Sequence, residues 1–166
     1  MRTRKEVNAF MREPEENGKV SVVRHSVVCE GSLTYGGKNT IYGPKVAVEL
    51  ANQLFRNSDR EMTLVCSLNT KNQPLTIEIV AIGTVNACMV GVAEAFKTAI
   101  VSNAAGIMLF HNHPSGVCAP SNEDVQLTQR FIDAGNLLGI TLKDHIICGM
   151  EGKYFSFKES GIIDGF

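Results

Sequence analysis

The chain has 166 residues, of which 44% are hydrophobic and 20% are charged. These proportions fit one domain with a full hydrophobic core and exclude a small disulfide-stapled protein or a disordered tail. Sixteen Lys and Arg against seventeen Asp and Glu give a net charge of −1, so no global positive field is available to attract nucleic acid or anionic lipid.

The N-terminus and the cysteines both indicate a cytoplasmic protein. The charged start MRTRKEVNAFMREPEEN lacks the apolar stretch of roughly 7–15 residues that a signal peptide requires, and no apolar run approaches the ~20 residues of a membrane span. The five cysteines form no CxxC pair and lie mostly in apolar runs such as LVCSL and HIICG. This pattern favours reduced, buried thiols, and no membrane partner is expected.

Two segments precede the first clear helix. Residues 20–29 (VSVVRHSVVC) are rich in β-branched side chains and predict a strand. Residues 31–43 contain several glycines and predict a hairpin or an exposed loop. We therefore assign residues 1–43 to an N-terminal extension with a β-hairpin, of unknown function, and residues 44–166 to the main domain, with both in one compact unit.

The middle of the chain predicts two helices and three strands. Pro44 suits the first turn of a helix, which apolar residues at helical spacing continue to about Asn57. Two apolar runs separated by the turn NTKNQP predict adjacent antiparallel strands over residues 62–84. Residues 90–102 keep the helical period, and the short apolar run AAGIMLF that follows predicts a strand buried on both faces. That strand leads directly into His111.

The last part of the chain predicts one helix and two strands. Residues 121–138 predict a third helix, which Gly139 closes. The segments ITLKDHIICG and KYFSFKE supply two further strands. Interleaved strands and helices, with hairpins where the turns are short, predict an α/β (α+β) fold in which helices flank a central mixed, mainly antiparallel sheet.

A motif of potential metal ligands follows the buried strand. His111 and His113, at i and i+2 of an extended chain, place both imidazoles on one side, where they can share one cation. Asp124 lies about one turn into the next helix, and the loop with proline at both ends can fold that helix start back toward the histidines. Two imidazoles and one carboxylate leave one position free on a tetrahedral zinc, as in a catalytic site.

Each part of this motif also has a purely structural interpretation. A lone histidine at a strand end is more often a surface or satisfied core residue than a ligand, and Ser121-x-x-Asp124 is the capping-box pattern of a helix start. The combination is rarer. Five fixed positions at roughly one in twenty each, over ~150 starting points, occur together by chance on the order of 5 times in 100,000. The capping role and the metal role are compatible.

These residues carry a family resemblance. The string H-x-H-P, six further residues and S-x-x-D resemble the signature of the JAMM metallopeptidases, the metal-binding branch of the MPN domains. The segments GTVNACMV, HNHPSG, PSNEDV and LKDHIICG, in this order from about Asp59 onward, resemble the RadC-like bacterial proteins. The resemblance implies the three-layer MPN fold, similar to cytidine deaminase, with zinc bound by His111, His113 and Asp124.

The same resemblance implies two catalytic residues. Glu61 matches the upstream glutamate that acts as general base, and Ser121 matches the serine that steadies the oxyanion. Glu94 is the rival general base, although a solvated charge on a helix face is the likelier account of it. Glu61 also has a structural interpretation, as a charge that guards a strand edge against pairing.

The expected function is zinc-dependent hydrolysis of a peptide or isopeptide bond, with a peptide or an isopeptide-linked protein as substrate. The alternative is a RadC-like interaction module in DNA repair or replication, with a non-catalytic or vestigial metal site. DNA binding is not supported by the net charge, and a homodimer stays open. A zinc deaminase is disfavoured because the H-x-E and P-C-x-x-C strings of those enzymes are absent.

Two residues near the motif leave alternatives open. His145, next to Asp144, either orients a ligand histidine from behind or is a hydrogen-bonded core histidine. Cys118 lies in the loop close to the proposed zinc, where its thiolate could occupy the open coordination position and keep the site latent.

Overall fold

The structure is a computed structural model that describes residues 24–36, 39–56, 58–83 and 90–163. Three α-helices, five strands and one short 3-10 helix lie within these residues. In chain order the elements are α2 (Pro44–Phe55), β1 (Met62–Leu68), β2 (Pro74–Ile82), α3 (Val92–Val101), β3 (Gly106–Asn112), α4 (Asn122–Leu138), β4 (Thr141–Cys148), η1 (Met150–Gly152) and β5 (Tyr154–Ser156).

The strands form one five-stranded sheet in the order β2-β1-β3-β4-β5. β3 and β4 are parallel, and the other three pairs are antiparallel. Helix α4 makes the crossover between the two parallel strands, as such a connection requires. This arrangement confirms the predicted mixed, mainly antiparallel sheet.

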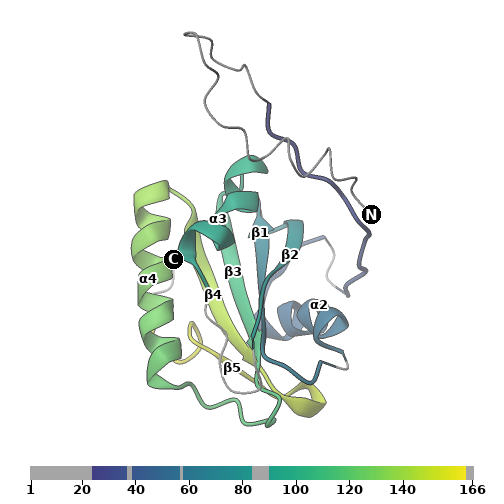
Figure 1. Ribbon diagram of the computed structural model, residues 1–166, viewed down its shortest axis with the longest axis vertical. Coiled ribbons are helices and arrows are strands. Elements are labelled where there is room, and N and C mark those ends of the chain that lie inside the picture. The colour runs from purple at the N-terminus through teal and green to yellow at the C-terminus, as the bar shows by residue number, and fades with distance from the viewer. Residues whose placement is uncertain (1–23, 37–38, 57, 84–89, 164–166) are drawn as a thin grey trace, which may run out of the picture.

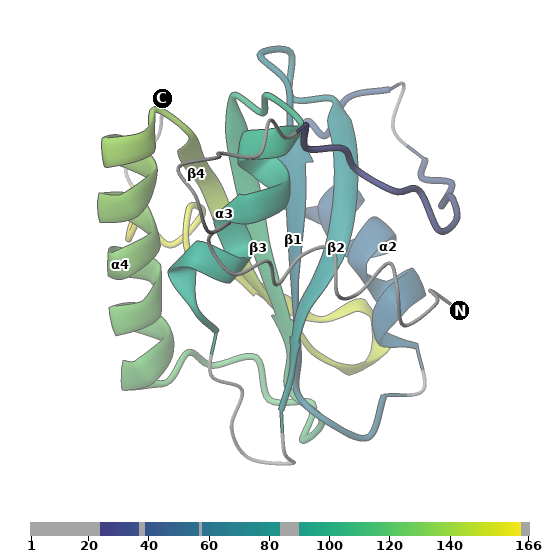
Figure 2. The ribbon, with the colours of Figure 1, turned by 45° about the horizontal axis from the view of Figure 1, so that its top comes forward.

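Helices cover both faces of the sheet, so the molecule has three layers. Figures 1 and 2 show α3 and α4 on one side of the strands and α2 on the other. Successive side chains of a strand point to opposite faces, and the core is accordingly split in two. The buried apolar residues of the sheet that face α2 are Met62, Leu64, Cys66, Leu68, Met108, Phe110, Ile146 and Cys148. Those that face α3 and α4 are Val65, Ile107, Leu109, Leu142 and Ile147.

The predicted helices and strands after residue 43 are confirmed, with small shifts at their ends. Helix α2 ends at Phe55 rather than near Asn57, and β3 extends to Asn112, past the predicted apolar run. Helix α4 begins after a capping box at Ser121 and ends at Gly139, whose φ of 68° is the left-handed conformation that favours glycine.

The predicted strand over residues 20–29 is wrong in the part that the structure describes. Residues 24–29 have no regular secondary structure, and the described residues of the 31–43 segment form no hairpin. Val27 and Val28 are 46% and 58% exposed, so their β-branched side chains lack the packing neighbours on which strand propensity depends. Residues 1–23 lie outside the described residues, and the division at residue 43 stays a prediction.

The cysteines only partly match their predicted burial. Cys66 and Cys148 are buried free thiols, and burial raises the pKa of each to about 12. Cys29 is exposed, contrary to the expectation, and Cys118 is partly exposed. Cys88 lies outside the described residues.

Among the described residues, no helix is long and apolar enough to cross a bilayer.

Candidate metal centre

Three potential metal ligands meet where β3 ends and α4 begins. His111 Nε2 lies 2.9 Å from His113 Nε2 and 3.2 Å from Asp124 Oδ1, and His113 Nε2 lies 3.8 Å from Asp124 Oδ2. The chain leaves the lower end of β3 and returns at the start of α4, which brings the carboxylate back to the histidines (Figure 1). Among the described residues, His111, His113 and Asp124 are the one such group within ligand distance of each other.

The hydrogen bond of His113 fixes the atom that it offers to a metal. His113 Nδ1 lies 2.6 Å from the carbonyl oxygen of Val117, and a carbonyl can only accept a hydrogen bond. Nδ1 therefore donates a hydrogen bond to the Val117 carbonyl oxygen, and in the neutral ring Nε2 then carries a lone pair. That lone pair faces His111 and Asp124.

His145 lies directly behind His111. Its Nε2 is 2.9 Å from His111 Nδ1, and its Nδ1 is 2.6 Å from the Thr128 hydroxyl. The His145 side chain is fully buried and stacks on Phe157, with ring centroids 4.7 Å apart. Burial lowers the pKa of His145 well below its usual value, and the neighbouring His111 lowers it further. Both causes favour the neutral form of His145.

A register shift brings His145 to this face of the sheet. Leu142 on β4 faces α3 and α4, so strict alternation would turn position 145 toward α2. The pairing of β3 with β4 slips by one residue between Ile107 and Met108, so that Met108 pairs with Asp144. After this irregularity the odd-numbered residues of β4 face α4. Such bulges often re-aim a side chain beside a functional site.

The capping box at the start of α4 orients the carboxylate of Asp124. The backbone N–H and the hydroxyl of Ser121 both donate to Asp124 Oδ2, at 2.8 and 2.7 Å, which leaves Oδ1 toward His111. Burial alone would raise the pKa of Asp124, but hydrogen bonds and charge from His111, together with the Ser121 bonds, hold it well below its usual range. Asp124 is thus an anion, as a metal ligand must be.

The donor set fits a divalent cation. Two imidazole nitrogens and one carboxylate oxygen converge on one point, and the His113 proton is directed away from it by Val117. Zinc accepts these ligand types, and three protein ligands leave a coordination position open. The structure thus brings together the His111–His113–Asp124 group expected from the sequence, and this group could hold a metal ion.

Glu61 immediately precedes β1 in the chain. β1 and β3 are antiparallel with Thr63 opposite His111, and continuing this register places Glu61 opposite His113. Directly opposed residues of an antiparallel pair share a face of the sheet. The backbone thus sets Glu61 and the two histidines on the same side.

Asn112 holds the backbone on both sides of Glu61. Its Oδ1 accepts a 2.7 Å hydrogen bond from the Met62 N–H, and its Nδ2 donates a 3.0 Å hydrogen bond to the Arg60 carbonyl. Asn112 lies between the two histidines in sequence and is buried. The sequence interpretation missed this role, although the alternation of a strand already turns Asn112 away from the histidines and toward the other face.

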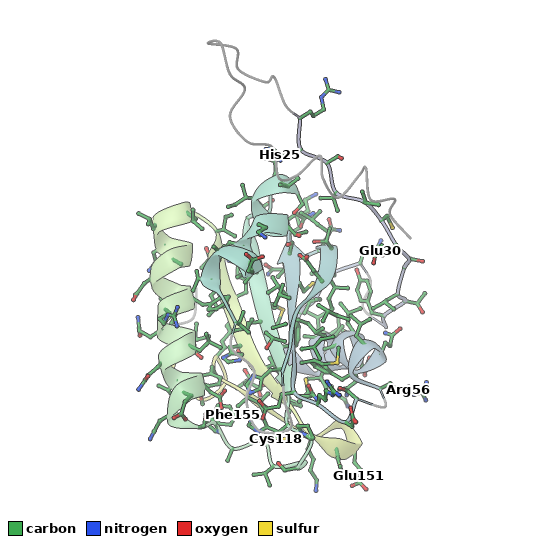
Figure 3. All side chains as sticks on the ribbon, in the orientation of Figure 1. His25, Glu30, Arg56, Cys118, Glu151 and Phe155 are labelled. Carbon is green, nitrogen blue, oxygen red and sulfur yellow. The ribbon has the colours of Figure 1, made fainter. Side chains whose placement is uncertain are left out.

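Three other residues considered from the sequence do not join the group. Glu94 forms an ion pair with Lys97 on the exposed side of α3. The Cys118 thiol is 3.8 Å from the Gly116 carbonyl oxygen and is not part of the group of potential metal ligands. Figure 3 shows Cys118 at the lower end of the molecule, where the chain passes from β3 to α4. Asp144 accepts hydrogen bonds from Ser156 and from the backbone of the C-terminal turn.

Comparison with known proteins identifies one family. Residues 41–162 match the family model described as the RadC-like JAB domain. The match covers all the elements described above and the whole candidate site.

Several curated proteins are similar to this chain over the same region. It is 40% identical over 126 residues to a UPF0758 protein of Methanosarcina barkeri, covering 76% of this chain and 55% of that protein. It is 47% identical over 120 residues to a UPF0758 protein of Desulforamulus reducens, covering 72% and 52%. The chain therefore spans about half the length of the curated relatives that it matches.

Proposed function

This chain belongs to the RadC-like JAB domain family, and from that premise we propose that it is a JAMM-type, zinc-dependent hydrolase of peptide or isopeptide bonds. One observation carries the proposal: His111, His113 and Asp124 direct three ligand atoms to one point. A purely structural zinc is more often closed by a fourth protein ligand. The proposed partner is a peptide or an isopeptide-linked protein, in the cytoplasm.

The proposed chemistry assigns separate roles to the three ligands, to Glu61 and to Ser121. A divalent ion held by the His111–His113–Asp124 group would supply a Lewis acid that acidifies water and polarises a carbonyl. Glu61 accepts the proton of the attacking water and later returns it to the leaving amine. The Ser121 hydroxyl, which now donates to Asp124 Oδ2, turns to donate to the developing oxyanion.

The position of the proposed general base supports this assignment over the rival one. The Asn112 amide holds the peptide groups on both sides of Glu61, and the register of β1 and β3, extended by two residues, supports a position opposite His113. Glu94 is instead paired with Lys97 and 59% exposed. A general base must lie within reach of the proton it takes, and the register supports Glu61 in this role.

The test is a comparison of Glu61→Gln with Glu94→Gln. Both variants and the unsubstituted chain are loaded with zinc and assayed on α-linked peptides and on peptides joined through a lysine ε-amine. We expect Glu61→Gln to retain its zinc and to lose about 100- to 10,000-fold in kcat, the usual contribution of a general base. Glu94→Gln should keep its full rate.

Each other outcome contradicts a part of the proposal. Equal rates for Glu61→Gln and the unsubstituted chain would remove Glu61 from the mechanism. A zinc-loaded chain without hydrolysis of either linkage would favour the interaction-module alternative. That alternative further predicts DNA affinity that falls steeply with salt, if DNA is the partner.

A further inference from the structure

Two residues outside the proposed ligand set form a hydrogen-bonded chain behind the metal site. Thr128 lies on α4, one turn after Asp124, and His145 lies on β4. The Thr128 hydroxyl is 2.6 Å from the Asp124 carbonyl and 2.6 Å from His145 Nδ1. His145 Nε2 is 2.9 Å from His111 Nδ1. Thr128 and His145 are each fully buried, so water does not supply alternative partners.

The direction of each hydrogen bond in this chain follows from what its atoms can do. The Asp124 carbonyl can only accept, so the single hydroxyl proton of Thr128 is donated to it. The Thr128 oxygen must then accept from His145 Nδ1. His145 Nδ1 thus carries a ring proton, and full burial disfavours the charged ring that a second proton would create. His145 Nε2 is therefore an acceptor, His111 Nδ1 donates to it, and His111 Nε2 is left to face Asp124.

We infer that Thr128 and His145 are positioning residues that fix the tautomer of His111 and tie it to the helix that carries Asp124. The hydrogen bonds run from the backbone of one ligand, Asp124, through two side chains to the ring of another, His111. This route joins α4, β4 and β3, which supply the ligands and their support. It turns Nε2 of His111 toward the point that His113 and Asp124 face.

The hydrogen-bond partner of His111 differs in kind from that of His113. His113 uses a backbone carbonyl, which is an acceptor in every state. His111 uses another imidazole, which accepts only while its own proton is held on Nδ1, and Thr128 is the residue that holds it there. The stacking of His145 on Phe157 would also occur in an ordinary core histidine. Packing alone does not set a tautomer, so the tautomer distinguishes a positioning residue from an ordinary core histidine.

The first test needs neither metal nor substrate. Long-range proton–nitrogen NMR correlations of the metal-free, nitrogen-15-labelled full chain, recorded at about pH 8 where ordinary imidazoles are neutral, report which ring nitrogen carries each proton. We expect the proton on Nδ1 in both His111 and His145. His25, which is exposed, serves as the internal reference. A proton on His145 Nε2, which would then donate to His111 Nδ1, would overturn the inference.

The second test compares zinc affinities of variants by competition with a chromogenic chelator. Thr128→Val keeps the side-chain shape and removes the hydroxyl, and we expect zinc binding about 10- to 100-fold weaker, the usual effect of losing a residue that supports a ligand. Thr128→Ser should restore the affinity. Ser156→Ala is the matched control, since it removes a buried hydroxyl that bonds Asp144 instead, and its zinc affinity should be unchanged.

The outcomes separate this inference from the proposed function. It rests on the metal site of that function and not on hydrolysis. A chain that binds zinc, shows the expected tautomer and hydrolyses no peptide contradicts the proposed hydrolase and supports the inference. Unchanged zinc affinity and tautomer in Thr128→Val would overturn the inference and leave the hydrolase intact. Should Thr128→Val not fold, the tautomer of the unsubstituted chain decides.

Discussion

The two faces of the sheet come from the same strands but bury different chemistry. On the α2 face, the side chains of β1, β3 and β4 are apolar along nearly their whole length. On the α3 and α4 face, the apolar residues lead to a polar group at one end, where His111 and His145 are buried side by side. Buried polar groups are costly unless hydrogen-bonded, and both histidines have partners.

This difference shows how a sheet with one apolar face can support a polar site on its other face. Along β3, Phe110 completes the apolar α2 face while His111, the next residue, faces the metal site. Alternation within one strand therefore divides the two tasks. Asn112, the last residue of β3, is a polar exception on the α2 side. Its amide hydrogen-bonds the backbone on both sides of Glu61, so the two faces meet at this end of the sheet.

The largest expected effect tests the independence of the faces. Phe110→Ala should lower the free energy of unfolding by about 3–5 kcal/mol, because it leaves a cavity in a fully buried position. The folded fraction should still bind zinc as tightly as the unsubstituted chain. Leu109→Ala, the matched change on the other face, should cost about 2–5 kcal/mol and also weaken zinc binding, since its cavity opens beside His111. Urea titration and chelator competition measure the two quantities.

Equal losses of zinc affinity in Phe110→Ala and Leu109→Ala would contradict the independence of the two faces. The faces would then act as one unit, and the site would depend on the stability of the whole domain.

A smaller effect is expected where the faces meet. Asn112→Ala removes both hydrogen bonds that hold the backbone around Glu61, and we expect kcat to fall about 10- to 100-fold, or about 1.4–2.7 kcal/mol in the barrier, with zinc retained. Asn69→Ala is the control, because the Asn69 amide holds the backbone of the turn at the other end of β1. It should leave kcat unchanged. A full rate in Asn112→Ala would contradict the positioning of Glu61.

The smallest expected effect concerns Ser121, which has one structural and one proposed catalytic role. Ser121→Ala removes the helix cap and should cost about 1 kcal/mol in unfolding free energy, whereas Ser121→Gly should cost only a few tenths. Both variants lack the hydroxyl, so both should lose the same factor in kcat. If kcat instead falls more in Ser121→Ala, the less stable variant, than in Ser121→Gly, Ser121 acts as a helix cap alone. Thermal unfolding and steady-state kinetics make the comparison.

Much of the fold was predictable because its signals are local. The helical spacing after Pro44 and the apolar runs of the central strands predicted the elements from residue 44 onward. The strand prediction failed at residues 24–29 for the opposite reason, since strand propensity is realised only beside a partner strand. Within the described part of the chain, residues 24–29 pair with no strand.

The candidate site was predictable in part. The ligands His111, His113 and Asp124 lie within fourteen residues, so their spacing alone predicted the group that the structure brings together. The support of His111 by His145 was not predictable beyond one of two alternatives. It depends on the register shift between β3 and β4, which no local pattern in the sequence specifies.

We propose that the His111–His113–Asp124 group holds a metal and that Glu61 is a separate base. Elemental analysis of protein purified without chelator tests this through the metal content of the unsubstituted chain, Glu61→Gln and His113→Ala. We expect about one zinc per chain in the first two and none in His113→Ala. No metal in the unsubstituted chain, or equal zinc in all three, would contradict it.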